Sequence, residues 1–222
     1  VKILRLVVSF LATLGTGMIL FSVIGLVFVY IPLGVAEVRY EFSKTQLAKL
    51  SRGVELKVWQ HSQKGVELEK RPEWVVPDNN YSIYIPKIFA ISRVIPDVNA
   101  NDPTVYLKAL QTGVAEMAGL AHPGQMGTTY LFAHSVGSRW DFARYNAVFY
   151  LLDKLVSGDK VEVFYQGELY KYEVVEKEVV AASNTKYLVP QSLSEKLVLQ
   201  TCYPPGTTWK RLIVVARRTD IL

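Results

Sequence analysis

One uncharged stretch divides this chain of 222 residues into two parts of different character. From Leu6 to Ile31 no side chain carries a charge, and the polar groups are only hydroxyls. About 20 apolar residues suffice for a helix to cross a bilayer. A buried core helix rarely runs so long without a stronger polar residue, and the core of a signal peptide is shorter. The stretch therefore predicts an uncleaved transmembrane anchor within residues 1–36.

The charges beside this stretch predict its orientation. Lys2 and Arg5 precede it, which favours a cytoplasmic N-terminus and an extracellular remainder. Arg39 and Lys44 follow it and reduce the difference between the two sides. We expect a single-pass protein of the cell membrane whose N-terminal helix contacts membrane lipid.

The net charge of +5 suits a membrane or an anionic cell-wall polymer as neighbour. The basic residues are scattered, with no basic run interleaved with aromatics, so the sequence predicts no nucleic-acid partner.

The remainder divides near Asn80. Residues 37–80 mix charges with isolated glycines and prolines and end in a Pro-Asp-Asn turn signal, which predicts a membrane-proximal stalk. Residues 81–222 form the expected catalytic domain. Here short apolar runs alternate with turns, at 81–86, 129–134, 160–165, 168–175, 196–201 and 211–216, and only Phe142–Leu155 has helical character. Seven or more closely spaced strands with few helices predict a mostly β protein, either a barrel or a sandwich.

Cys202 is the only cysteine, which excludes an intramolecular disulfide and argues against a thiolate metal site. A lone cysteine is most often a small buried hydrophobe. Cys202, however, follows the apolar run Leu197–Thr201, and Tyr203-Pro-Pro ends that strand at once. A thiol in this place faces a loop-bordered mouth, where a nucleophile is useful.

Two other residues occupy comparable strand ends. Of the three histidines, only His134 ends an apolar strand. Arg211 opens the strand after Cys202, and the loop from Tyr203 to Lys210 would return it beside the thiol. An arginine keeps its charge, so it is suited to hold an oxyanion rather than to act as a base.

These residues also carry a family resemblance. Leu199-Gln-Thr-Cys-Tyr-Pro followed by Arg211-Leu-Ile-Val resembles the sortase signature, in which Thr-Cys ends one strand and Arg opens the next. Phe132-Ala-His134, preceded by Pro123-Gly-Gln-Met-Gly127, is similar to the segment around the sortase histidine. The likeness covers about residues 81–218. Many sortases have Gly-His-Arg where this chain has Ala-His-Ser, so no subclass is assigned.

The resemblance implies a closed sortase-like barrel of about eight strands with one or two short helices, and a cysteine transpeptidase without a cofactor. Cys202 would attack a C-terminal Leu-Pro-x-Thr-Gly-like sorting signal of a secreted protein and form a thioacyl enzyme. His134 would protonate the leaving amine, and Arg211 would hold the oxyanion. An amine from a cell-wall precursor or a pilin would accept the protein. Thr201 would contact the substrate backbone or, equally, serve only in packing.

Other interpretations stay open at this point. One is a different Cys-His peptidase of the cell wall, and another is a non-catalytic, membrane-tethered β-domain that binds wall polymer or protein. For a metal, the available carboxylates do not alternate within one loop, so the sequence predicts no metal site. The carboxylates considered are Glu116, Asp141, Glu176 and Glu178.

Overall fold

The computed structural model describes residues 10–11, 13–25, 34, 37–38, 40–42, 77–78, 80–135, 148–190 and 193–219. The chain divides into two units, Val1–Thr45 and Gln46–Leu222. In the first unit, residues 10–11 and 13–25 are helical and exposed. Among the residues described, no helix is both long enough and apolar enough to cross a membrane. The transmembrane anchor therefore stays a prediction, and nearly all of the expected stalk at 37–80 lies outside the described residues.

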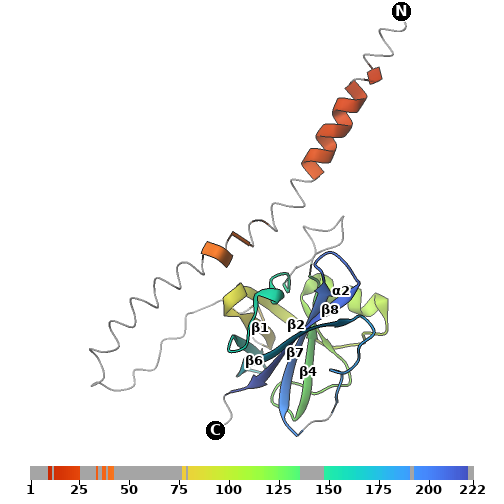
Figure 1. Ribbon diagram of the computed structural model, residues 1–222. Helices are drawn as coiled ribbons and strands as arrows, with labels where there is room; N and C mark the ends of the chain where they lie inside the picture. The colour runs from red at the N-terminus through yellow and green to blue at the C-terminus, as the bar shows by residue number, and fades with distance from the viewer. Residues whose placement is uncertain are drawn as a thin grey trace, which may run out of the picture. The chain divides into compact units, whose positions relative to one another are not determined.

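The second unit contains a closed barrel of eight strands in the order β1-β2-β3-β4-β7-β8-β6-β5. This order confirms the expected mostly β fold and its closed barrel. Figure 1 labels six of these strands and the helix α2 (Pro103–Thr112). The strands are β1 (Tyr81–Ile85), β2 (Ala90–Val98), β3 (Val114–Met117), β4 (Gly127–Phe132), β5 (Lys160–Tyr165), β6 (Glu168–Ala181), β7 (Glu195–Tyr203) and β8 (Lys210–Arg218).

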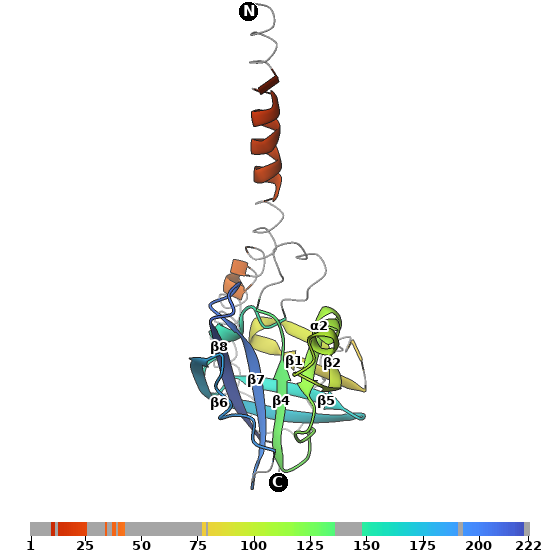
Figure 2. The same ribbon diagram turned by 90° about the vertical axis from the view of Figure 1, so that its right-hand side faces the viewer.

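The middle of this sheet brings together strands that are distant in sequence. β4 pairs with β7 in parallel, and β7 pairs with β8 antiparallel. Figure 2 shows β4 and β7 side by side, with β8 and β6 following on one side. The side chains of β7 alternate between two environments, because successive residues of a strand face opposite sides of the sheet. Leu197 and Leu199 are fully buried inside the barrel with Leu131 and Val214.

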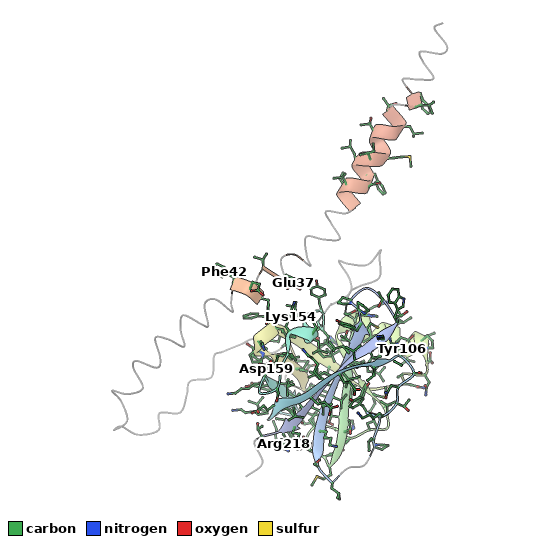
Figure 3. The ribbon with its side chains drawn as sticks, in the orientation of Figure 1. Glu37, Phe42, Tyr106, Lys154, Asp159 and Arg218 are labelled. Atoms are coloured by element: carbon green, nitrogen blue, oxygen red, sulfur yellow. The ribbon has the colours of Figure 1, made fainter. Side chains whose placement is uncertain are left out.

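The outer face of the same strands packs under the helix α2 (Pro103–Thr112). Tyr106 of α2, labelled in Figure 3, contacts this outer layer. The buried members of the layer come from α2 and from six strands. They are Val98, Ala109, Leu110, Ala115, Tyr130, Phe132, Val180, Val198, Ile213 and Val215.

The helices differ from the sequence prediction. Where Phe142–Leu155 was expected to be helical, the described part consists of turns and the 3-10 helix η2 (Leu152–Lys154). The expected helix is thus wrong over residues 148–155, and residues 142–147 lie outside the described part. α2 was not predicted, although its start carries clear signals. Asp102 caps it by accepting a hydrogen bond from the Thr104 amide at 2.9 Å, and Pro103 occupies its first turn.

Two strands, β2 and β3, were also missed. The β2–β3 register shifts between Ile95 and Val98, and Asp97 there adopts a left-handed backbone with φ of 54°. This bulge breaks the alternation by which a strand is recognised in sequence. By contrast, the predicted β5–β6 hairpin is confirmed. Its turn residues Gln166 and Gly167 both have positive φ, as a two-residue hairpin turn of type I′ requires.

A buried carboxylate, Glu195, fixes the start of β7. Its Oε1 accepts hydrogen bonds from the Tyr172 hydroxyl at 2.5 Å and from the Gly124 amide at 2.8 Å. Arg218 of β8, labelled in Figure 3, donates to the other oxygen at 2.9 Å. Charge-assisted hydrogen bonds of this kind compensate the cost of burying a carboxylate. Glu195 thereby ties β6, β7, β8 and the loop before β4 together.

We predict that Arg218→Met lowers the free energy of unfolding by about 2 to 3 kcal/mol, because it leaves the Glu195 charge buried without its counter-ion. Lys186→Met is the matched control. Lys186 also pairs with a carboxylate, Glu178, but both side chains are exposed, so its loss should change stability little. Urea unfolding monitored by circular dichroism measures both. Equal effects of the two substitutions would contradict the assigned role of Glu195.

Candidate active site

The end of β7 and the start of β8 place Cys202 opposite Arg211. The two residues are direct partners in the antiparallel register. Directly opposed residues of such a pair have Cβ atoms about 5 Å apart and point to the same side of the sheet. The structure therefore brings the predicted nucleophile and the predicted oxyanion holder together. Cys202 is half-buried and not bonded to another cysteine.

The end of β4 carries His134 to the other side of Cys202. The last pair of the parallel β4–β7 register is Phe132 with Gln200. The Ala133 amide continues this ladder by donating to the Gln200 carbonyl at 3.1 Å. Two residues beyond the last pair, the same register puts His134 beside Cys202. The three predicted residues thus lie at adjoining ends of three neighbouring strands.

All three side chains belong to the outer face of the sheet. Phe132 and Ile213 are each two residues from His134 and Arg211, and both lie in the outer apolar layer. Side chains two residues apart along a strand share a face. The outer layer therefore ends in three polar side chains, which form what we call the catalytic face: His134, Cys202 and Arg211.

Arg211 is held by the backbone around the β7–β8 loop. Its Nη1 donates to the carbonyls of Thr208 and Lys210, each at 3.1 Å. A guanidinium has five N–H groups, so the two contacts leave donors for another acceptor. Burial raises the pKa of Tyr130, and the positive charge of Arg211 opposes that shift.

Two residues next to the catalytic face, Tyr130 and Gln200, were not predicted. Tyr130 of β4 precedes His134 in the chain, and Gln200 precedes Cys202 along β7. The Tyr130 hydroxyl donates to the Gln200 side-chain oxygen at 2.7 Å. This bond links β4 to β7 on the outer face. The signal was available in the sequence, because Gln200 stands two residues before Cys202 and Tyr130 stands four before His134.

Thr201 faces the other way. It is only 3 % exposed, and its hydroxyl donates to the Ala133 carbonyl at 2.9 Å. The structure does not bring this side chain to the catalytic face. A substrate contact by Thr201 stays a prediction without support in this geometry. The observed bond instead clamps the residue before Cys202 to the residue before His134.

Burial also determines the protonation of His134. The imidazole is half-buried, and desolvation lowers its pKa below the ordinary value of 6.5. The charged imidazolium is disfavoured when it loses contact with water. At neutral pH the neutral ring therefore predominates in the free protein, and the protonated ring is the minor species.

Comparison with known proteins identifies the family. A family model described as "Sortase domain" matches residues 83–219. The chain belongs to the sortase family. Sortase D of Bacillus subtilis (strain 168) is 27 % identical over 137 residues, which are 60 % of this chain and 61 % of that protein. The chain thus spans about three fifths of the length of this curated relative.

Solved sortase structures share the fold. Sortase A from Corynebacterium diphtheriae, a lid mutant, has a TM-score of 0.54 and 27 % identity, covering 68 % of this chain and 75 % of that one. Sortase C-1 from Actinomyces oris has a TM-score of 0.53 and 27 % identity, covering 65 % and 76 %. Sortase C1 of GBS Pilus Island 1 has a TM-score of 0.53 and 25 % identity, covering 64 % of each chain.

For this sortase we predict that His134 titrates below 6.5, for the desolvation given above. Because the folded pKa is the lower one, the unfolded chain binds the proton more readily. The contribution of His134 to stability is therefore full above about pH 6.5 and is lost as the pH falls toward the folded pKa. NMR of histidine-labelled protein measures the midpoint, with His134→Gln for assignment and the urea-unfolded chain as reference. A folded midpoint at or above the unfolded one would contradict the prediction.

We also predict that Thr201→Val lowers the free energy of unfolding by about 1 to 2 kcal/mol, because the Ala133 carbonyl loses its buried donor. Thr201→Ser keeps a hydroxyl at the same place and serves as the control. Urea unfolding and the His134 ring resonances are the two measurements. If serine and valine behave alike in both, the hydroxyl clamp has no part in fixing the strand ends.

Proposed function

We propose that this chain is a membrane-anchored cysteine transpeptidase. Its substrate would be a secreted protein with a C-terminal Leu-Pro-x-Thr-Gly-like sorting signal, and its second substrate an amine. The observation that carries the proposal is the meeting of Cys202, His134 and Arg211 on one face, at the adjoining ends of β7, β4 and β8. Membership of the sortase family supports the same reaction class.

In the first half of the reaction the Cys202 thiolate attacks the threonine carbonyl carbon of the signal. The carbonyl oxygen becomes an oxyanion, and the Arg211 guanidinium next to the thiolate donates hydrogen bonds to it. Collapse of this intermediate breaks the Thr–Gly C–N bond. The leaving amine takes a proton from the His134 imidazolium, and a thioacyl enzyme remains.

In the second half the acceptor amine attacks the thioester carbonyl. His134, now neutral, takes the proton from the attacking nitrogen, and Arg211 again holds the oxyanion. The C–S bond breaks and returns the thiolate, while the new amide joins the two proteins. Acceptors of suitable chemistry are a cell-wall precursor amine and a pilin lysine. One structural relative, Sortase C1 of GBS Pilus Island 1, is named after a pilus island, which supports the pilin lysine as acceptor.

The apolar surface of the first unit supports the proposed anchor. Its helical residues expose apolar side chains along the helix, among them Phe10 at 66 %, Met18 at 66 % and Phe21 at 76 %. A helix that is apolar all round requires either a protein core or lipid around it. Lipid contact by this segment, with the barrel outside the cell, would place Cys202 where secreted sorting signals emerge.

The test is trapping of the thioacyl enzyme. Incubated with a library of sorting peptides, the protein should gain the mass of the N-terminal fragment of one peptide. Hydroxylamine, which cleaves thioesters, should remove this fragment. Cys202→Ala should abolish the adduct while leaving the circular dichroism spectrum unchanged. Cleavage of any sorting peptide by the Cys202→Ala protein would overturn the proposal.

Arg211→Lys provides the second arm of this experiment. It keeps both the thiol and the positive charge, but a point ammonium does not reproduce the forked donors of a guanidinium. Loss of one oxyanion donor typically costs about 100- to 1000-fold in turnover. Near-normal turnover of Arg211→Lys would exclude the oxyanion role and leave the nucleophile assignment standing.

A further inference from the structure

A second group of reactive side chains lies away from the catalytic face. Asp97 at the end of β2, Glu116 of β3 and His122 of the following loop each offer one ligand atom, and these atoms lie within 4.8 Å of one another. Glu116 pairs with Leu131 of β4, whose side chain is fully buried in the barrel. The neighbouring Ala115 belongs to the outer layer, so Glu116 faces the opposite side of the sheet.

The contacts within the group are short. His122 Nδ1 lies 3.0 Å from Glu116 Oε2, and His122 Nε2 lies 4.0 Å from Asp97 Oδ1. The other Glu116 oxygen accepts a hydrogen bond from the Tyr81 hydroxyl at 2.5 Å. The imidazole ring stacks on Tyr165 at 5.6 Å between ring centres. Glu116 Oε2 is thereby aimed at the imidazole, with the carboxylate fixed from behind by Tyr81.

The charge of Glu116 is not balanced as that of Glu195 is. Both carboxylates are buried, at 1 % and 5 % exposure. Glu195 has Arg218 as counter-ion at 2.9 Å, whereas within the described ranges no Lys or Arg forms an ion pair with Glu116. Burying a carboxylate without a counter-ion is costly. A cation beside His122 and Asp97 would remove that cost.

We propose that Asp97, Glu116 and His122 bind a divalent transition cation of the Zn²⁺ class. Imidazole together with carboxylates is a ligand set that Zn²⁺ accepts, usually with four ligands at about 2.0 to 2.2 Å. Water completes the set. Glu116 is fixed in place, while Asp97, 66 % exposed at the bulge of β2, is able to rotate onto the ion. Tyr81 acts as the outer partner that orients the Glu116 ligand.

The site joins the end of β2, the strand β3 and the loop that follows β3. β2 and β3 meet in an irregular parallel pair, and the loop after β3 leads into β4. A metal ion bridging the three would stabilise the folded state by mass action, because the unfolded chain does not preform the site. Its function is therefore structural, and it does not depend on the transpeptidase reaction.

The experiment uses the full chain in detergent, without an affinity tag and carrying Cys202→Ala, so that no thiolate competes for the ion. Titration calorimetry with ZnCl₂ should give one saturable equivalent per chain. Zn²⁺ should also raise the melting temperature, and Co²⁺ should give visible absorption bands typical of low coordination number. His122→Ala and Asp97→Asn should each weaken binding at least about 10-fold, and Tyr81→Phe about 10-fold or more.

Glu178→Gln is the matched control, because Glu178 belongs to an exposed acidic pair on β6 and should leave binding unchanged. Absence of saturable Zn²⁺ binding would overturn the proposal. Binding that survives both Asp97→Asn and His122→Ala would overturn it as well. If His122→Ala does not fold, Asp97→Asn decides, since its side chain is exposed and its loss leaves the core intact.

Discussion

The register of β7 between β4 and β8 is the constraint on which the rest of the site depends. Leu199 lies between Leu131 of β4 and Val214 of β8, and all three side chains are fully buried in the barrel. A slip of β7 by one residue would turn Leu199 to the outer face and put its neighbour Gln200 into the apolar interior. The interior therefore fixes the positions of strand ends that it does not touch, including Cys202. One packing requirement sets the relative places of nucleophile, histidine and arginine.

The two faces of these strands have different tasks. The inner face contributes the buried side chains of the barrel interior. The outer face is apolar where it packs under α2 and becomes polar where the strands end. Polar bonds at the transition keep the two strands aligned. Tyr130 binds Gln200 on the outer face, and Thr201 binds the Ala133 carbonyl on the inner face. His134 and Cys202 are thus held from both sides by residues that need not touch a substrate.

Contacts between residues close together in the sequence could be predicted from the sequence, whereas contacts between distant residues could not be predicted from local patterns. Cys202 and Arg211 stand at the two ends of one short loop, so strand-end signals alone predicted their meeting. His134 lies 68 positions before Cys202 in the chain, and its place required the family resemblance or the barrel itself. α2 was missed because it has no clear apolar face: only Ala109 and Leu110 are buried, while Val105 and Leu107 are exposed. The Asp102-Pro103 cap nevertheless signalled its start. The bulge in β2 concealed that strand, because the bulge breaks the alternation.

The group of Asp97, Glu116 and His122 likewise could not be predicted from local sequence patterns. A search for carboxylates within one loop finds nothing, since the three residues come from a strand end, a strand interior and a loop. A glutamate in the short sequence Val-Ala-Glu-Met is expected at the surface, yet Glu116 is almost completely buried within β3. Long-range topology, rather than local pattern, decides which carboxylates become buried.

The proposed chemistry explains why the third residue of the catalytic face is an arginine. The attack needs a thiolate, which is favoured by higher pH, and departure of the amine needs an imidazolium, which is favoured by lower pH. Burial lowers the pKa of His134 and makes that second form scarcer near neutrality. A histidine or lysine in the place of Arg211 would add a further titrating group to this balance. A guanidinium supplies its positive charge and its donors at every pH at which the protein is folded, so oxyanion stabilisation is separated from the proton transfers.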